Sequence, residues 1–568
     1  MANKRVIIEF RYQPELDAAA RSLDAAAGIA AAEAAMRPAV AFSLDPTFAP
    51  VRLPGLVPRT RDADPADTGA LLALDTAPEA ASYLMRGEVE EQDAAALAAQ
   101  VGNNVTGVFA DAVMEPQLVC PGSAPVGTHL DVERLLCVRR MRRCRMNGRG
   151  VLVAIVDGGV NLAYLNAQGK NPTFDAARSF STVPGVVPGS APVGHGTMCA
   201  FDACIAAQRC TLLDIAVLRP FDGTPSGFGA LLSDIVRAYA HLLNVMLAPR
   251  RPGDLRSMVV NNSWGLFSMA WDFPPGDPSN YSDNPNHPFN RAVATLERAG
   301  ADILFAAGNC GADCPDGRCD TTVNTIRGAN GHPAVLCVAG VDTTKARVGY
   351  SSIGPGRLAQ NKPDISGYTH FQGSGVYAAD GGTSAACPVV AGVVAAVRSK
   401  RPYNPASPAT APAAIRGLMT RTAEDLGAAG YDFAHGFGVA NGCTLARRLC
   451  DDDDDDDDDD IAGPIPDLGP ISDLCRRFPW ICKPHVPPIF DLCRRYPWLC
   501  QQMVPIPPRL PPDPPFGADG TMQPADLQDE AEFAYMMGLL HGQQLASSRA
   551  AATAEAPAKP GGCGRCKD

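Results

Sequence analysis

Between residues 150 and 445, short and almost purely apolar segments alternate with longer segments whose apolar residues recur at helical spacing. Strands buried on both faces are hydrophobic throughout, and amphipathic helices cover them, so this alternation predicts a parallel sheet with helices on both faces. We place one α/β domain at residues 150–447. Its expected strands are residues 151–156, 212–218, 258–260, 303–307 and 335–341, and its expected helices are 199–206, 229–247, 289–299 and 384–400.

The region before this domain has the pattern of a smaller α+β unit. Strand-like alternation and helix-like periodicity follow one another, separated by turn residues. We predict an α+β domain at residues 1–118 and a linker at 119–149. The expected elements are a strand at 5–11, a helix at 14–27, a strand at 81–89, a helix at 90–99 and a strand at 105–110.

The composition changes abruptly after Cys450. Ten consecutive aspartates at 451–460 repel one another and stay solvated, so they predict an extended linker. Residues 461–568 are rich in proline and cysteine and are expected to be largely irregular. Within them DLCRRFPWIC recurs as DLCRRYPWLC, an 18-residue repeat. We interpret it either as two disulfide-closed loops that dock an unknown partner or as two spacer turns.

Charge and hydropathy exclude several classes of function. The aspartate run accounts for most of the net charge of −12, and no basic patch points to nucleic acid. No apolar run reaches the about 18 residues of a membrane helix. The first residues, MANKRVIIEFRY, are too charged for a Sec signal peptide. The 19 cysteines do not decide the compartment, so the localisation stays open between export by another route and the cytoplasm.

Polar residues suited to chemistry lie at the ends of the expected elements. Asp157 follows the apolar run VLVAIV, His195 lies in GHGTMCA, and Ser384 lies in GGTSAACP, with Pro388 expected in the first turn of the next helix. A serine hydroxyl becomes nucleophilic beside a base, and that base needs a third group to orient it. Asn309, after ILFAAG, offers an amide to a developing oxyanion. Together these residues predict acyl transfer.

The segments VAIVDGGV, GHGT, NNSWG, AAGN and GTSAACP, in this order, resemble the subtilisin (subtilase) family of serine peptidases over roughly residues 150–445. The resemblance implies a serine endopeptidase that hydrolyses polypeptide substrates through an acyl-enzyme. It implies no cofactor or metal for the chemistry; structural calcium occurs in the family, but we assign no ligands. Gly158 departs from the family pattern, which usually has Thr or Ser after the aspartate.

The resemblance also assigns two groups of substrate-binding residues and an inhibitor. Residues 1–118 would be a ferredoxin-like prodomain that fills the cleft with its C-terminal segment and is cut away between about 111 and 145. An edge strand would pair with the substrate backbone, and a pocket wall would enclose the residue before the cut. The first group is Ser263, Trp264 and Gly265, and the second is Ala306, Ala307 and Gly308.

Several cysteines lie close to these candidates in the sequence. The spacing of Cys310, Cys314 and Cys319 is not that of CxxC zinc pairs, and we interpret them as bracing a loop beside the oxyanion site by a disulfide. Cys199 and Cys387 fall on inward helix faces, so we expect small buried residues without a catalytic part.

Two other classes of function stay open at this point. One is a binding protein on a catalytically dead subtilase scaffold. The other is a docking or adhesion module in the tail, with proteolysis serving only maturation.

Overall fold

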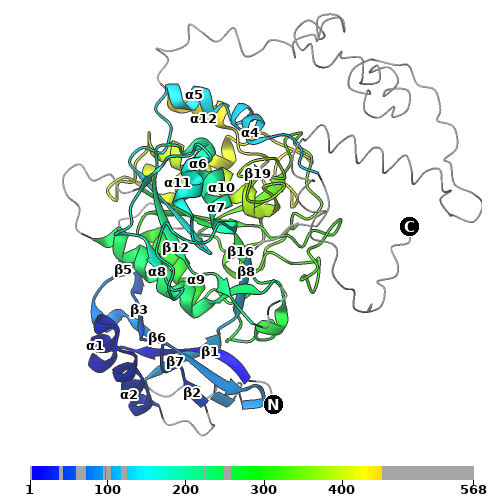
Figure 1. Ribbon diagram of the computed structural model, residues 1–568. Coiled ribbons are helices and arrows are strands. Elements are labelled where there is room, and N and C mark those ends of the chain that lie inside the picture. The colour runs from blue at the N-terminus through cyan, green and yellow to red at the C-terminus, as the bar shows by residue number, and fades with distance from the viewer. Residues whose placement is uncertain are drawn as a thin grey trace, which may run out of the picture. The chain divides into compact units, whose positions relative to one another are not determined.

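The computed structural model describes residues 3–36, 42–58, 72–93, 96–97, 104–116, 124–222, 224, 226–248 and 257–450 (Figure 1). The aspartate run, the repeat and the rest of the tail, as well as residues 117–123, lie outside the described residues. Within the described part, no helix is both long and apolar enough to cross a bilayer.

An eight-stranded sheet with only parallel pairings forms the centre of the α/β domain. Its order is β10-β12-β9-β15-β17-β18-β19, and β11 also pairs with β12. The parallel sheet of the predicted α/β domain is therefore confirmed. The two-residue strands β10 and β11 and the short β19 are too brief to stand out as apolar runs. The strands are β9 (Val151–Asp157), β10 (Thr173–Phe174), β11 (Phe180–Ser181), β12 (Thr211–Ala216), β15 (Ser257–Asn262), β17 (Ala301–Ala306), β18 (Leu336–Val341) and β19 (Ile365–Tyr368).

Helices cover both faces of this sheet (Figure 1). Successive side chains of a strand point to opposite faces, which explains why β9 is apolar at every position before its last residue. Val151, Val153 and Ile155 belong to the apolar cluster of α7 and α10, and Leu152, Ala154 and Val156 to that of α8 and α9. The helices are α4 (His129–Leu135), α5 (Val138–Arg143), α6 (Leu162–Ala167), α7 (His195–Ala206), α8 (Leu232–Leu247), α9 (Pro288–Arg298), α10 (Gly382–Arg398), α11 (Pro412–Arg421) and α12 (Gly442–Leu449).

Two details of the α/β domain differ from the prediction. The helix expected from residue 229 begins at Leu232, because the residues before it pair with other strands as β14 (Phe228–Leu231). Pro388 lies inside α10 and not in its first turn. A proline there cannot donate to the carbonyl oxygen four residues earlier, that of Ser384.

The N-terminal unit is built on an antiparallel sheet of order β2-β6-β1-β7, with β3 also on β6. The helix predicted over 14–27 is two helices, because Leu23 takes a left-handed φ of 55° and the Asp24 side chain caps the second helix. Within the helix predicted at 90–99, a 3₁₀ turn at Glu91–Asp93 and two helical residues are described. The elements are β1 (Asn3–Arg11), α1 (Pro14–Ser22), α2 (Ala25–Ala35), β2 (Phe42–Leu44), β3 (Val51–Leu53), β6 (Ser82–Glu90) and β7 (Val105–Ala110), with β4 (Gly55–Pro58) and β5 (Leu72–Asp75) as a separate pair.

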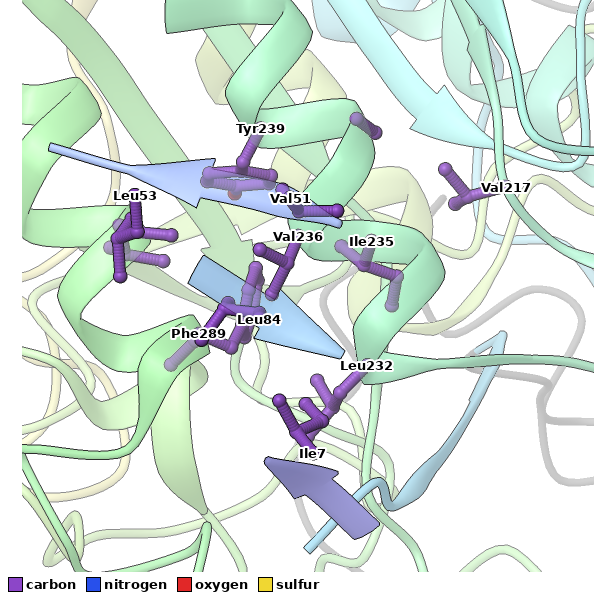
Figure 2. Packing of buried hydrophobic residues seen from close by; sticks show 14 of the residues in the cluster. Ile7, Val51, Leu53, Leu84, Val217, Leu232, Ile235, Val236, Tyr239 and Phe289 are labelled. Carbon is purple, nitrogen blue, oxygen red and sulfur yellow. The ribbon is translucent and has the colours of Figure 1, made fainter. Parts of the chain in front are cut away.

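This N-terminal sheet packs on the outer side of α8 and α9. Figure 2 shows Ile7, Val51, Leu53 and Leu84 of the N-terminal unit against Leu232, Ile235, Val236 and Tyr239 of α8 and Phe289 of α9. All of them are buried, and each contributes about 1.5–3 kcal/mol relative to an exposed position. Ion pairs from Arg86 to Asp234, at 2.6 Å, and from Arg291 to Glu9, at 2.7 Å, join the same surfaces. Apolar packing and ion pairs therefore both hold the N-terminal unit against the α/β domain.

Two disulfides join α5, which lies in the region 119–149 predicted as a linker, to α12 at the end of the α/β domain. Cys137 pairs with Cys443 and Cys144 with Cys450, which links α5 to α12. The sequence analysis made no prediction for these four cysteines, because each bridge spans 306 positions.

Candidate active site

The carboxylate of Asp157 orients the imidazole of His195. Asp157 ends β9 and is fully buried, and His195 is the first residue of α7. His195 Nδ1 lies 2.9 Å from each carboxylate oxygen, so Nδ1–H donates to Asp157. The helix start needs Gly196, because a Cβ there would lie 2.5 Å from the Gly159 carbonyl oxygen. The opposite ring nitrogen, Nε2, is buried and makes no hydrogen bond to any described residue.

Two hydrogen bonds join Ser384 and Ser263. Ser384 lies in the first turn of α10 and is fully buried. Its hydroxyl donates to the Ser263 carbonyl oxygen at 3.2 Å. Its own carbonyl oxygen, which Pro388 leaves without a helical donor, accepts from the Ser263 hydroxyl at 3.0 Å. The start of α10 is thus tied to the segment that carries β16 (Trp264–Gly265).

The sulfur of Cys199 contacts all three residues of the predicted triad. It lies 3.8 Å from Asp157 Oδ2, 3.9 Å from His195 Nδ1 and 3.6 Å from the Ser384 carbonyl oxygen. The fold therefore brings the Asp157 carboxylate, the His195 imidazole and the backbone of Ser384, from three separate elements, into contact with one sulfur atom. Burial and the negative charge of Asp157 raise the pKa of the Cys199 thiol well above its usual value, so it stays protonated. Cys387 is also buried and unbridged, and both cysteines match the expectation of small buried residues.

Three ligand atoms of Asp157, His195 and Cys199 lie within 4.8 Å of one another. A metal ion would have to displace the thiol proton and break the Asp157–His195 hydrogen bond. This donor set therefore fits a hydrogen-bonded pair better than a metal centre.

Asn309 is positioned by the residue before Ser384. Its side-chain oxygen accepts from the backbone N–H and from the hydroxyl of Thr383, both at 2.9 Å. Gly308 N–H donates to the same hydroxyl at 3.1 Å. Because Asn309 Oδ1 faces Thr383, the side-chain NH₂ group of Asn309 is directed away from Thr383. The sequence analysis did not identify Thr383 as a site residue. Thr383 orients Asn309 through a contact between residues 74 positions apart, which no local pattern reveals.

The last strand of the N-terminal unit lies between two edge strands of the α/β domain. β8 (Val113–Pro116) pairs antiparallel with β14 on one side and with β16 on the other. Figure 1 shows β8 and β16 side by side. Trp264 is opposite Pro116, and Gly265 is opposite Glu115. The Trp264 side chain is buried and donates to the Val156 carbonyl oxygen at 2.9 Å, so only its backbone faces β8.

A small pocket lies at the end of β16, and part of the predicted wall lines it. Gly265, Ala307 and Gly308 line it. Ala306 is not among the lining residues; it is buried, and its carbonyl oxygen accepts from Asn330 at 2.8 Å. The other lining residues are Leu266, Phe267, Cys310, Thr325, Arg327 and Asn330.

The loop after Asn309 is braced by a disulfide between Cys310 and Cys319, as predicted. Cys314 is disulfide-bonded as well. The loop also presents Arg318, which the sequence analysis missed. Arg318 Nη1 lies 3.2 Å from the Glu115 carboxylate, 203 positions away, and no local pattern signals such a contact.

Gly158 makes room for an aromatic side chain. A Cβ at this position would lie 2.9 Å from the ring of Phe228, at the start of β14. The ring of Phe228 therefore occupies the space that the side chain of the usual Thr or Ser would need.

A second buried carboxyl group lies near Asp157. Asp214 in β12 accepts from the backbone N–H groups of Gly189, at 2.8 Å, and Val160, at 3.1 Å. Burial and the charge of Asp157 outweigh these hydrogen bonds and raise the pKa of Asp214 to about 6.

Comparison with known proteins gives consistent matches. The subtilase family (peptidase S8) profile matches residues 148–438. Subtilisin DY from Bacillus licheniformis is 32% identical over 302 residues, which are 52% of this chain and 90% of that protein. Subtilisin NAT from Bacillus subtilis subsp. natto is 24% identical over 301 residues, 52% of this chain and 65% of that protein. A crystal structure of a lanthipeptide protease aligns at 15% identity with a TM-score of 0.40, covering 56% of this chain and 94% of that one.

Proposed function

Because this chain belongs to the subtilase family, we propose that Asp157, His195 and Ser384 form the catalytic triad of a serine endopeptidase acting on polypeptides. Members of this family are subtilisin-type serine endopeptidases that need no cofactor for catalysis. The observation that carries the residue assignment is the buried 2.9 Å contact between Asp157 and His195, beside a cysteine sulfur that also touches the Ser384 backbone.

The reaction follows from the chemistry of these groups. Ser384 Oγ attacks the substrate carbonyl carbon while its proton moves to His195 Nε2. Asp157 stabilises the imidazolium, which then gives the proton to the leaving amine. Water attacks the acyl-enzyme by the reverse of the same steps and releases Ser384. The Asn309 amide and the Ser384 backbone N–H stabilise the oxyanion that forms twice in this cycle.

The N-terminal unit acts as an intramolecular inhibitor. An antiparallel strand added to an exposed sheet edge is a common mode of peptide binding, and β8 occupies such a position on both β14 and β16. The register pairs Glu115 with Gly265 and Pro116 with Trp264. Ser263, whose carbonyl oxygen accepts from the hydroxyl of Ser384, directly precedes Trp264, so the bond to be cut is expected to follow the end of β8 closely. We therefore expect self-cleavage directly after Gln117.

A serine-directed fluorophosphonate probe on the full chain tests the triad. We expect the label on the peptide that contains Ser384, and a new N-terminus at Leu118 in the wild type but not in Ser384→Ala. The control Ser22→Ala, at an exposed position at the end of α1, should be labelled and processed like the wild type. A label on another serine, or identical processing of wild type and Ser384→Ala, would refute the assignment.

A further inference from the structure

Glu115 places a buried carboxylate against the α/β domain. Its side chain is fully buried although it lies on a four-residue strand at the edge of the N-terminal unit. One carboxylate oxygen accepts from Arg318 Nη1 at 3.2 Å and from the Ser226 backbone N–H at 3.2 Å, and the Ser226 hydroxyl also donates to it. A buried carboxylate is stable only with such charged and polar donors.

The arginine of this site is held in place without Glu115. Asp316 binds the Arg318 guanidinium through two side-chain hydrogen bonds, at 2.9 and 2.8 Å. The guanidinium lies over the Phe267 ring, 3.8 Å from its centroid, and the Cys310–Cys319 disulfide closes the loop that carries it. Only 7% of the Arg318 side chain is exposed. The donor is therefore preorganised.

Both groups that bind the carboxylate belong to the α/β domain and border the strand-addition site. Ser226 precedes β14, and Arg318 Nη2 donates to the Pro116 carbonyl oxygen at 2.9 Å, next to β16. Removal of the N-terminal unit would leave Arg318 and Ser226 in place. A substrate chain pairing in the same register would then bring its own side chain to the position of Glu115.

We propose that Arg318 and Ser226 form a carboxylate-binding subsite of the processed peptidase. The subsite selects an acidic side chain, glutamate above all, two residues before the residue whose carbonyl is attacked. This inference rests on the proposed function and adds a specificity determinant to it. A neutral glutamine at that position keeps the shape but loses the charge pairing, and a lysine brings two cations together in a buried site.

Peptides with the sequence of residues 112–119, AVMEPQLV, and its variants with Gln or Lys in place of Glu115, test the subsite in the processed enzyme. We expect kcat/KM to fall about tenfold or more for the Gln peptide and about a hundredfold or more for the Lys peptide. In Arg318→Gln the Glu and Gln peptides should be cleaved at similar rates. Arg347→Gln is the matched control, since Arg347 pairs with Asp313 of the same loop without touching Glu115, and it should keep the wild-type ratio.

The wild-type series decides the question even if Arg318→Gln does not fold. Equal cleavage of the three peptides by the wild-type enzyme would overturn the subsite while leaving the peptidase assignment intact. An unchanged preference for Glu in soluble Arg318→Gln would overturn the role of Arg318. Loss of cleavage of every peptide together with loss of probe labelling at Ser384 would instead be a failure of the proposed function itself.

Discussion

Pro388 shows how one residue shapes the surroundings of Ser384, the proposed nucleophile. Its missing N–H leaves the Ser384 carbonyl oxygen without the donor that a regular helix would supply. The Ser263 hydroxyl, at 3.0 Å, and the Cys199 thiol, at 3.6 Å, take that place. Ser384 is consequently hydrogen-bonded both to Ser263 and to Cys199 of α7, so its position does not depend on α10 alone.

Replacing Asn309 with alanine is expected to lower kcat by about 10²–10³ with little change in KM, because the donor acts on the oxyanion that develops during the reaction. This magnitude comes from subtilisin itself, a relative of the chain. Steady-state kinetics on a peptide substrate measures the effect. The matched control is Asn309→Asp, which keeps an oxygen for Thr383 and lacks the amide donor. A loss of kcat below threefold in both variants would contradict the role.

Replacing Asp214 with asparagine is expected to change how stability depends on pH. The folded pKa of about 6 exceeds the ordinary 3.8, so the carboxyl contributes full stability below pH 3.8, and this is lost as the pH rises to 6. Asp214→Asn should match its parent near pH 4 and exceed it by up to about 3 kcal/mol above pH 6. Denaturant unfolding at both pH values, in a Ser384→Ala background, measures the difference. A pH-independent difference would disprove the expectation.

At the scale of elements, the start of α9 joins the two folded units. His287 caps this helix through Nδ1, which accepts from the Phe289 N–H at 3.2 Å. Its Nε2–H donates to the Ala110 carbonyl oxygen of β7 at 2.9 Å. Burial, and to a lesser degree the charge of Arg291, lower the pKa of His287 to about 3. The cap of α9 therefore requires a neutral imidazole, because a protonated Nδ1 cannot accept from Phe289. Arg291 is itself paired to Glu9.

Low pH is expected to weaken the packing of the N-terminal unit on the α/β domain, because His287 becomes protonated. The folded pKa of His287 lies below the ordinary 6.5, so its contribution to the free energy of unfolding is complete above pH 6.5. That contribution falls by about 1.4 kcal/mol per pH unit as the pH decreases towards 3. Hydrogen exchange of β7 amides in Ser384→Ala at pH 6.5 and 4.5 measures it. His287→Gln should remove most of the change with pH over this interval. An equal pH response in both proteins would exclude His287 as its source.

At the scale of the whole molecule, the two long-range disulfides close the α/β domain at its ends. Both join α5 to α12 across 306 positions. A long closed loop restricts the unfolded chain more than a short one, and loss of a native disulfide commonly costs 2–5 kcal/mol. Because the two bridges close almost the same loop, the second adds less than the first.

Cys443→Ser is therefore expected to lower the free energy of unfolding modestly, while Cys443→Ser with Cys450→Ser should lower it by about 2–5 kcal/mol. Denaturant unfolding of both in a Ser384→Ala background, with and without reductant, measures the losses. With reductant present, the parent and the double variant should have the same free energy of unfolding, because reductant breaks the remaining disulfides in both. Equal losses from the first and the second replacement would show that the bridges act independently.

The sequence predicted the sheet and most of its strands, because burial on both faces requires continuous apolar runs, as in the segment that forms β9. Its errors fall where a contact from elsewhere overrides the local pattern. Residues 229–231 carry a helical pattern, but they become β14 because β8 lies beside them. The break at Leu23 depends on a left-handed residue followed by the Asp24 cap, a local signal that the alanine-rich pattern obscured.

By itself, the sequence determined the α/β class, the order of the chemical groups, and their location where strands end and helices begin. Those properties depend on residues close together in the chain. Only the tertiary structure decided that Arg318 meets Glu115 and that Cys137 meets Cys443. Such pairs depend on the path of the whole chain, because residues hundreds of positions apart become neighbours only after every intervening strand and helix has packed.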